Sequence, residues 1–319
     1  MISLAFYDLL AGSGKTTLAY HLAHMFQRSG LTILTVDLDP QADLTRVFLT
    51  EDDSSDLWPQ PALFELAEPS APPLTSADSS IELPGPRRIN DGIWLLPGHV
   101  GLFRFESPLA ASWQPALAGD PAAIENITTF RRLIAQAAES VSADLVLIDI
   151  GPNLDAISRS ALLAADAFIT PLNGNLRSQL SISTLGPAVR KWWDAWSKLR
   201  LEHPESAAAQ SIGQAVPLGY TITKLDRRRT KDFWIDNLIE IYQHAFLDPD
   251  DDPSDYDLGR LRYYGSLMEL AERAHKPMFD LRPSDGAIGS TQKYVQICRD
   301  EFRALADNIL DRLDRVRKP

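Results

Sequence analysis

The hexapeptide Gly12-Ser13-Gly14-Lys15-Thr16-Thr17 decides the fold of this 319-residue chain. A strand-like apolar run at residues 2–7 precedes it, and a helical pattern begins at Thr16 and reaches about Arg28. A second strand-like run, residues 31–36, follows and stops at Asp37. Strand, glycine loop, helix and strand in this order form a βαβ unit, so we expect the two strands to be parallel.

The rest of the chain alternates between apolar runs typical of strands and longer stretches typical of helices. We expect further strands at residues 93–96, 145–148, 167–170, 218–223 and 276–279, and helices at 123–140 and 291–316. This alternation predicts an α/β fold with a doubly wound, mostly parallel sheet and helices on both faces. Because we find no linker or internal repeat, we expect residues 1–319 to form one domain. A surface excursion is expected at about 51–90, around a short helix at 61–67.

The composition excludes several classes of protein. Acidic residues outnumber basic ones, 43 to 31, which gives a net charge of −12, and 45% of the residues are hydrophobic. That apolar content excludes global disorder, and no apolar run is long enough to span a membrane. The N-terminus lacks the pattern of a secretory signal, and Cys298 is the only cysteine, so no internal disulfide or thiolate metal cluster can form. We therefore expect a cytoplasmic protein.

The loop at residues 10–17, called the phosphate loop below, has the chemistry of an anion site. Glycines allow a tight turn that presents backbone N–H groups to an anion, and the start of the following helix adds free N–H groups. Lys15 would neutralise the β- and γ-phosphates of a nucleotide, and the Thr16 hydroxyl would coordinate Mg²⁺. The full pattern has glycine where this chain has Leu9. The candidate phosphate contacts are Ala11, Gly12, Ser13, Gly14, Lys15, Thr16 and Thr17.

Acidic residues follow two of the apolar runs. Asp37 and Asp39 lie at the end of the second strand, and Asp149 follows the run at 145–148. Because ligands of open α/β sheets bind at the carboxyl ends of the strands, we expect all three acids to face the phosphate loop. Mg²⁺ prefers oxygen ligands and retains waters, so Thr16, Asp39 and Asp149 are its candidate ligands, partly through water. An acid near the γ-phosphate can also orient the attacking water.

Together these residues resemble the ParA/MinD family of P-loop ATPases. The resemblance rests on residues 12–17, on Val-Asp-Leu-Asp-Pro-Gln-Ala-Asp-Leu-Thr at 36–45 and on Ala-Asp-Leu-Val-Leu-Ile-Asp-Ile-Gly-Pro-Asn at 143–153. It implies a P-loop NTPase fold and an ATP hydrolase that forms a homodimer around ATP and Mg²⁺. It further implies slow hydrolysis, a small adaptor protein that stimulates it, and positioning of a cargo such as a plasmid, a chromosome or a protein organelle on nucleoid DNA.

The resemblance also assigns roles to single residues. Lys15 and Thr16 would bind phosphate and Mg²⁺. Asp39 would support hydrolysis, and Asp149 with Pro152 would form the second switch segment. Lys15, Asp39 and Asp149 are therefore the candidate catalytic residues.

One departure concerns the lysine that opens the family's loop, K-G-G-x-G-K-[ST]. In the family this lysine reaches the partner's nucleotide across the dimer. Here Leu10 replaces it, and Ala11 replaces the first glycine. The McdA proteins, which position carboxysomes, also lack this lysine. Either another cation substitutes, with Arg177 as the candidate, or activation across the dimer is weak. Asp8 adds a charge beside the loop that the resemblance does not explain.

A second motif follows the apolar run at 218–222. Thr223-Lys224-Leu225-Asp226 resembles the base-reading motif of GTPases, in which the aspartate accepts two hydrogen bonds from guanine. Signal-recognition-particle GTPases carry a similar string, but Asp-Pro-Gln at 39–41 is foreign to them. We therefore favour ATP, with Thr223, Lys224 and Asp226 near the base, and keep a GTP-dependent targeting factor as the alternative.

Three features bear on partners. Two basic stretches would, in a dimer, contact DNA phosphates without sequence preference, although solvated or nucleotide-bound arginines are an equal alternative. These residues are Arg227, Arg228, Arg229, Lys231, Arg260 and Arg262. The aspartate-rich run 248–257 is expected to be an exposed loop. The last helix mixes both charges on its polar face, so we favour docking on the protein core over the membrane contact of MinD-like relatives.

Two further alternatives keep the nucleotide site and change its use. One is a small-molecule kinase or ligase, which would turn over ATP only with an acceptor. The other is a nucleotide-binding scaffold without hydrolysis, which the replacement of the lysine by Leu10 would fit.

Overall fold

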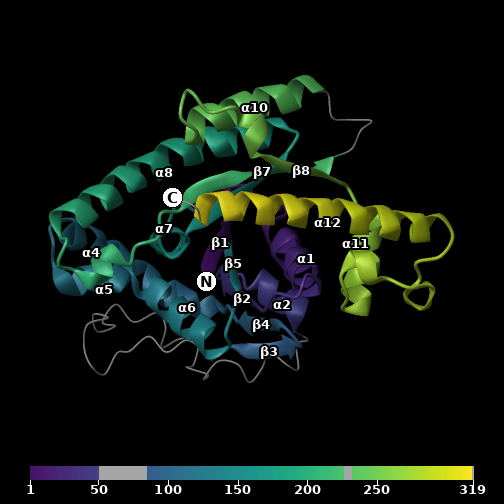
Figure 1. Cartoon of the computed structure of the whole chain (residues 1–319), viewed down its shortest axis with the longest axis horizontal. Coiled ribbons are helices and arrows are strands. Elements are labelled where there is room, and N and C mark those ends of the chain that lie inside the picture. The colour runs from purple at the N-terminus through teal and green to yellow at the C-terminus, as the bar shows by residue number, and fades with distance from the viewer. Residues whose placement is uncertain (50–84, 226–231, 318–319) are drawn as a thin grey trace.

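The computed structural model describes residues 1–49, 85–225 and 232–317 (Figure 1). Within them, eight strands form one sheet in the order β3-β4-β2-β5-β1-β6-β7-β8. All neighbouring strands are parallel except β3 and β4. The strands are β1 (Ile2–Phe6), β2 (Ile33–Leu38), β3 (Arg87–Asn90), β4 (Ile93–Leu96), β5 (Leu145–Ile150), β6 (Ala167–Asn173), β7 (Val216–Leu225) and β8 (Asp257–Arg262). The predicted doubly wound, mostly parallel sheet is confirmed.

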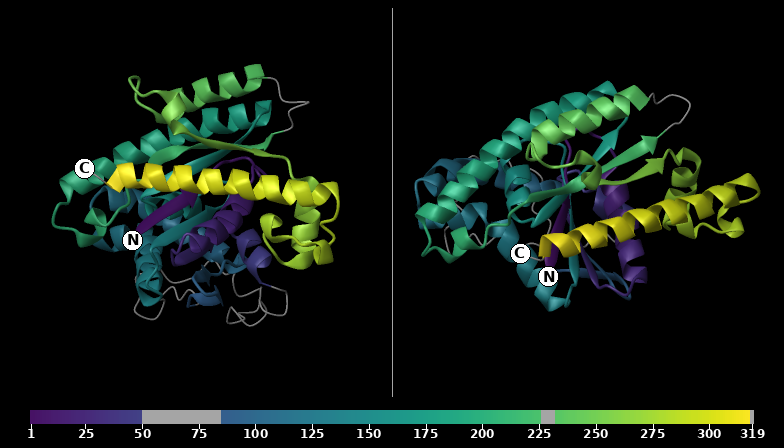
Figure 2. Two further views of the ribbon diagram at one scale, coloured as in Figure 1. Left: turned by 45° about the vertical axis from the view of Figure 1, so that its right-hand side comes forward. Right: turned by 45° about the horizontal axis from the view of Figure 1, so that its top comes forward.

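Helices cover both faces of this sheet. They are α1 (Lys15–Arg28), α2 (Asp43–Phe48), α4 (Glu106–Leu117), α5 (Pro121–Ile127), α6 (Thr129–Ser140), α7 (Ala156–Leu163), α8 (Leu176–Glu202), α9 (Ala207–Gln210), α10 (Asp232–Phe246), α11 (Gly265–Ala274) and α12 (Ser290–Arg317). Short 3₁₀ helices are η2 (Val100–Phe105), η3 (Pro253–Tyr256), η4 (Met278–Asp280) and η5 (Pro283–Asp285). Figure 2 shows α12 along one face of the sheet and α8 with α10 on the other.

The strand side chains alternate between two apolar cores, one beneath each helical layer. In β5, Val146 and Ile148 pack with the α4–α10 layer, whereas Leu145 and Leu147 pack with α1, α11 and α12. All residues of β5 are buried. A strand covered on both faces needs apolar residues at nearly every position, which explains its continuous apolar sequence.

The last helix packs on the core, as the sequence predicts. Cys298, Phe302, Leu305 and Ile309 of α12 are buried against the residues of α1 and β1. Among the described residues, no helix combines the length and apolar character needed to cross a membrane. The apolar stripe of α12 is therefore occupied by the protein's own core.

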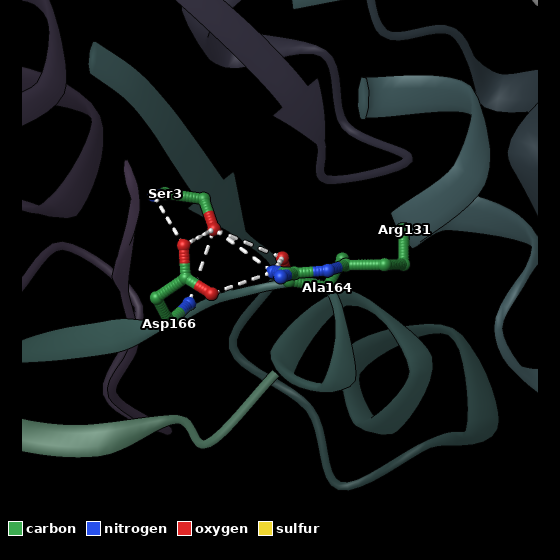
Figure 3. A network of polar contacts seen from close by, with 4 residues as sticks. All are labelled: Ser3, Arg131, Ala164 and Asp166. Atoms are coloured by element: carbon green, nitrogen blue, oxygen red, sulfur yellow. Dashed lines mark hydrogen bonds and ion pairs between the residues drawn. The ribbon is translucent and has the colours of Figure 1, made fainter. Parts of the chain in front are cut away.

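The amino ends of β1 and β6 are joined by a polar network (Figure 3). Asp166 accepts hydrogen bonds from the Ser3 backbone N–H at 2.8 Å and from its hydroxyl at 2.9 Å. Arg131 of α6 donates to Asp166 Oδ1 and to the Ala164 carbonyl, both at 2.8 Å. This network fixes α6 and the end of α7 to the sheet, at the strand ends opposite to the phosphate loop.

The eighth strand differs from the sequence prediction. Residues 276–279 are not a strand, because Pro277 cannot donate to a sheet and the Met278 N–H donates to His21 Nε2 at 3.1 Å. The strand is instead β8, which begins at Asp257, the last residue of the run expected to be a loop.

Two other boundaries also differ. The helix expected at 123–140 is divided into α5 and α6 at Thr128, whose hydroxyl donates to the Ile124 carbonyl at 2.8 Å. The excursion expected to reach residue 90 ends in β3, which pairs antiparallel with β4. The short helix expected at 61–67 lies outside the described residues.

Candidate nucleotide-binding site

The phosphate loop joins the carboxyl end of β1 to the first turn of α1. Gly12 and Gly14 have φ angles of 73° and 107°, in the left-handed region that favours glycine. Gly14 precedes Lys15, the first residue of α1, and its carbonyl accepts the Leu18 N–H at 2.8 Å. The free N–H groups of this first turn therefore face the end of the sheet where β2 and β5 also terminate.

Lys15 lies folded back inside the loop. Its side chain is buried, and Nζ donates to the carbonyl of Asp8 at 3.0 Å and to that of Leu10 at 3.4 Å. Burial lowers the pKa of Lys15, and nearby carboxylates, Asp149 foremost, oppose this shift. An anion at the helix terminus would give the ammonium group a stronger partner than two backbone carbonyls.

Thr16 and Asp149 form the candidate metal position. Thr16 Oγ1 donates to Asp149 Oδ2 at 2.6 Å, while Asp149 Oδ1 is buried without a hydrogen-bond partner among the described residues. Burial, with the neighbouring charge of Asp37, raises the pKa of Asp149 to about 8. A hydroxyl beside a buried, unsatisfied carboxylate oxygen is a donor set that suits Mg²⁺, whose charge would stabilise the ionised acid.

Asp39 lies on the side of the site next to the segment that follows β5. It is 7% exposed, and its Oδ1 accepts the Gln41 N–H at 2.9 Å. A Cβ atom at Gly151 would lie 3.3 Å from the same oxygen, so the segment after β5 passes directly against Asp39. Burial raises the pKa of Asp39. Asp39 and Asp149 therefore lie together at this edge of the sheet, as the sequence predicts.

Asp37 does not face the loop, which corrects the expectation for this acid. Its Oδ2 accepts the Thr45 N–H at 2.8 Å and the Thr45 hydroxyl at 2.7 Å, and Oδ1 accepts the Asp39 N–H at 3.2 Å. A Cβ atom at Gly98 would lie 2.6 Å from its carboxyl carbon. Burial raises the pKa of Asp37 to about 7. Asp37 thus anchors the segment that carries Asp39.

The end of β7 packs against the phosphate loop. Thr223 Oγ1 lies 2.6 Å from the Ser13 carbonyl and 2.6 Å from Asn173 Oδ1. Lys224, with a φ of 55°, donates through Nζ to the Gly12 carbonyl at 2.5 Å. Thr223 and Lys224 therefore contact the loop itself, whereas Asp226 lies outside the described residues.

The structure describes three of the basic residues proposed to replace the missing lysine or to contact DNA. Arg177 is exposed in the first turn of α8. Arg260 pairs with Asp257, and Arg262 pairs with Glu301 at 2.7 Å, so carboxylates offset both charges. The remaining candidate DNA contacts, Arg227, Arg228, Arg229 and Lys231, lie outside the described residues.

Three polar side chains that support the site were not predicted. Thr45 holds Asp37, Asn173 contacts Thr223, and Ser181 of α8 accepts the Leu9 N–H at 3.1 Å and donates to Asp8. Thr45 lies within the segment 36–45 quoted above, and its place in that segment was the only feature of the sequence that could have pointed to its role. Ser181 and Asn173 reach the site only through the chain's tertiary fold.

A comparison of sequences agrees with this arrangement. A family model described as an AAA domain matches residues 1–197, well over half of the chain. The chain belongs to this family, within the ParA/MinD class of P-loop ATPases. A putative replication protein A of Rhizobium rhizogenes is 29% identical over 54% of this chain and 40% of its own length. A probable plasmid-partitioning protein ParA of Thermus thermophilus is 27% identical over 63% of this chain and 54% of its own length. The chain thus spans about half the length of the curated relatives it matches.

Solved structures share the fold over nearly the whole chain. A protein of Corynebacterium diphtheriae is 23% identical with a TM-score of 0.67, and the match covers 98% of this chain and 99% of that one. An ATP complex of a Cyanothece McdA variant is 17% identical with a TM-score of 0.59, covering 98% and 96%. At these identities the likeness concerns the fold.

Proposed function

We propose that this chain is a ParA-type ATPase that binds ATP and Mg²⁺ at the phosphate loop and forms a homodimer in that state. Slow hydrolysis, stimulated by a small adaptor protein, would end the assembled state. Nucleotide-controlled contacts with non-specific DNA and with partner proteins would position or segregate a cargo, such as a plasmid, a chromosome or a protein organelle. The observation that carries the proposal is the hydrogen bond between Thr16 and Asp149 beside the buried Lys15.

The site offers a separate role to each of four side chains. Lys15 would leave its backbone carbonyls and neutralise the β- and γ-phosphates. Thr16 and Asp149 would hold Mg²⁺, which would offset charge on the phosphates. Asp39, close to Gly151, would orient the attacking water. Catalysis would then consist of positioning and charge neutralisation.

Nucleotide binding is tested by calorimetry with ATP and Mg²⁺. We expect the wild-type chain to bind, and Lys15→Ala to lose at least about tenfold in affinity because a charge-assisted contact is removed. Lys198→Ala is the matched control, since Lys198 is a 71% exposed lysine of α8. Equal affinities for Lys15→Ala and wild type would disprove the assignment of the site.

Assembly and DNA binding need separate measurements. Light scattering after size-exclusion chromatography should show a mass increase with ATP that Lys15→Ala lacks. Fluorescence anisotropy with a labelled non-specific duplex at low salt should show binding of the ATP-loaded form, with a strong decrease as salt rises. The DNA part of the proposal fails if the ATP-loaded protein does not bind the duplex at low salt.

A GTP-dependent targeting factor is the second candidate, and the contacts of Thr223 and Lys224 with the loop favour it. These residues begin the string Thr223-Lys224-Leu225-Asp226. Competition between ATP and GTP for the site separates the two candidates. Asp226→Asn should weaken GTP binding, and leave ATP binding unchanged, only if this aspartate reads guanine.

A further inference from the structure

Asp8 is a carboxylate enclosed in the wall of the phosphate loop. Its side chain has no solvent exposure. Oδ1 accepts a hydrogen bond from the Ser181 hydroxyl, and Oδ2 has no hydrogen-bond partner among the described residues. A buried carboxylate normally accepts several hydrogen bonds or pairs with a cation. Asp8 therefore has one buried carboxylate oxygen without a hydrogen-bond partner among the described residues, beside a loop built for anions.

One cation stabilises the ionised form of Asp8. Among the described residues, the charged or titratable groups that act on it are Lys15 of α1 and Tyr7 at the end of β1, and α8 contributes the uncharged Ser181. Lys15 Nζ lies 3.0 Å from the carbonyl oxygen of Asp8. Burial raises the pKa of Asp8. The Ser181 hydrogen bond and the Lys15 charge oppose this shift, and Ser13 and the Leu10 backbone oppose it to a smaller extent.

A polyphosphate in the loop would reduce the stabilisation that Lys15 gives to ionised Asp8. It would draw the Lys15 ammonium towards its own oxygens, and it would place two or more negative charges on the same loop. Like charges at short distance in a low-dielectric wall oppose ionisation, which favours the neutral carboxyl group. The unpaired Oδ2 is the position where a proton can be added without breaking the hydrogen bond from Ser181.

We propose that Asp8 takes up a proton from solvent when a nucleoside triphosphate occupies the phosphate loop, so that nucleotide binding by this chain is coupled to proton uptake. The O–H bond forms on Oδ2, and the proton comes from the buffer, so no other bond changes. This inference rests on the proposed function, because it requires a triphosphate in the loop.

The coupling has a definite sign. Because the nucleotide complex holds more protons on Asp8 than the empty protein, the contribution of Asp8 to nucleotide affinity weakens as pH rises. The affinity depends on pH in this way only between two pKa values of Asp8. The lower one is its pKa in the empty protein, which is raised above the ordinary 3.8, and the upper one is its pKa in the nucleotide complex. Within that interval one full proton corresponds to about tenfold in affinity per pH unit.

The test counts protons directly. Calorimetric titrations of ATP and Mg²⁺ into the protein, in buffers with different ionisation enthalpies at one pH, give the number of protons taken up. We expect wild type to take up more protons than Asp8→Asn, because asparagine keeps the shape and cannot be protonated. Asp91→Asn is the matched control, since Asp91 is 91% exposed, and its count should equal that of wild type. Comparing variants also cancels any proton released from Asp149.

Ser181→Ala provides a second variant for the same proton count. Loss of this donor destabilises the ionised form, so the empty variant already holds part of a proton and takes up fewer on binding. Equal proton counts for wild type, Asp8→Asn and Ser181→Ala, with ATP bound in each, would overturn this inference and leave the proposed function standing. Failure of the wild-type chain to bind ATP at all would overturn both.

Discussion

Thr16 Oγ1 donates a hydrogen bond of 2.6 Å to Asp149 Oδ2, which joins the first turn of α1 to the carboxyl end of β5. The second oxygen of Asp149 is buried without a partner among the described residues. The Thr16 hydroxyl and the Asp149 carboxylate are both suited to Mg²⁺, and here they are hydrogen-bonded to each other. Asp149 is left with one buried oxygen that no group among the described residues compensates, which is unfavourable. This arrangement predicts that the site lowers the stability of the metal-free protein.

Asp149→Asn should stabilise the metal-free chain at high pH. The pKa of Asp149 in the folded protein, about 8, lies above the ordinary 3.8, so the free energy of unfolding falls as pH rises from about 4 to about 8. Asparagine removes this loss while keeping an acceptor for Thr16. We expect a gain of about 1 kcal/mol or more at pH 8 in EDTA and little change at pH 4, measured by urea unfolding.

The same variant should lose the Mg²⁺-dependent part of ATP binding, because an amide is a weaker ligand than a carboxylate. Asp91→Asn, at an exposed position, should change neither property. A lower stability of Asp149→Asn at pH 8 would contradict this view of the site.

Gly151→Ala should slow hydrolysis and leave ATP binding intact. Its Cβ would lie 3.3 Å from Asp39 Oδ1 and 3.4 Å from Cγ, so the aspartate has to shift by a few tenths of an ångström. Misplacing a water-orienting group acts on the transition state, and we expect about a tenfold lower kcat with an unchanged Kd for ATP. Gly85→Ala is the control, because nothing lies within 4 Å of its added Cβ. Equal kcat values for Gly151→Ala and wild type would argue against a role for Asp39.

The elements around the phosphate loop could be predicted because their sequence reflects local physics. β5 is buried on both faces and therefore apolar throughout, and the left-handed turns at Gly12 and Gly14 need glycine. β8 could not be predicted in the same way. Its only buried apolar side chains are Leu258 and Leu261, separated by a glycine and an arginine, so no run of apolar residues marks it.

The site was predictable where chemistry is carried by a motif, and less so where it depends on tertiary contacts. Asp39 and Asp149 lie at strand ends, and parallel strands bring such ends together. Asp37 pairs in register with Asp149 and lies on the same face of the sheet, but the N–H and hydroxyl of Thr45 occupy its carboxylate. Ser181 is 173 residues from Asp8, and a serine within a helix gives no signal of such a contact.

Thr223→Val should weaken nucleotide binding by loosening the phosphate loop. The variant keeps the shape of the side chain and removes the hydroxyl that lies 2.6 Å from the Ser13 carbonyl. Loss of one such hydrogen bond costs about 1 kcal/mol, so we expect about a fivefold higher Kd for ATP.

Thr221→Val is the matched control for Thr223→Val. Thr221 lies two residues earlier on β7, and its hydroxyl donates to the Gly259 carbonyl at 2.8 Å, away from the loop. This control should lower the free energy of unfolding by a similar amount and leave the Kd unchanged. If both variants changed the Kd equally, the Thr223 hydroxyl would affect binding only through general stability and not through its contact with the loop.

The network at the opposite edge of the sheet should contribute to stability and have no effect on nucleotide binding (Figure 3). Arg131 and Asp166 are 25% and 26% exposed, and the aspartate also accepts two hydrogen bonds from Ser3. A double-mutant cycle with Arg131→Ala and Asp166→Asn should give a coupling of about 1–3 kcal/mol in urea unfolding, because both groups are largely withdrawn from water. The exposed pair Arg46 and Asp43 provides the comparison, at 66% and 50% exposure, and should give less than about 1 kcal/mol. Similar couplings for the two pairs would show that solvent screens the half-buried pair as fully as the exposed one.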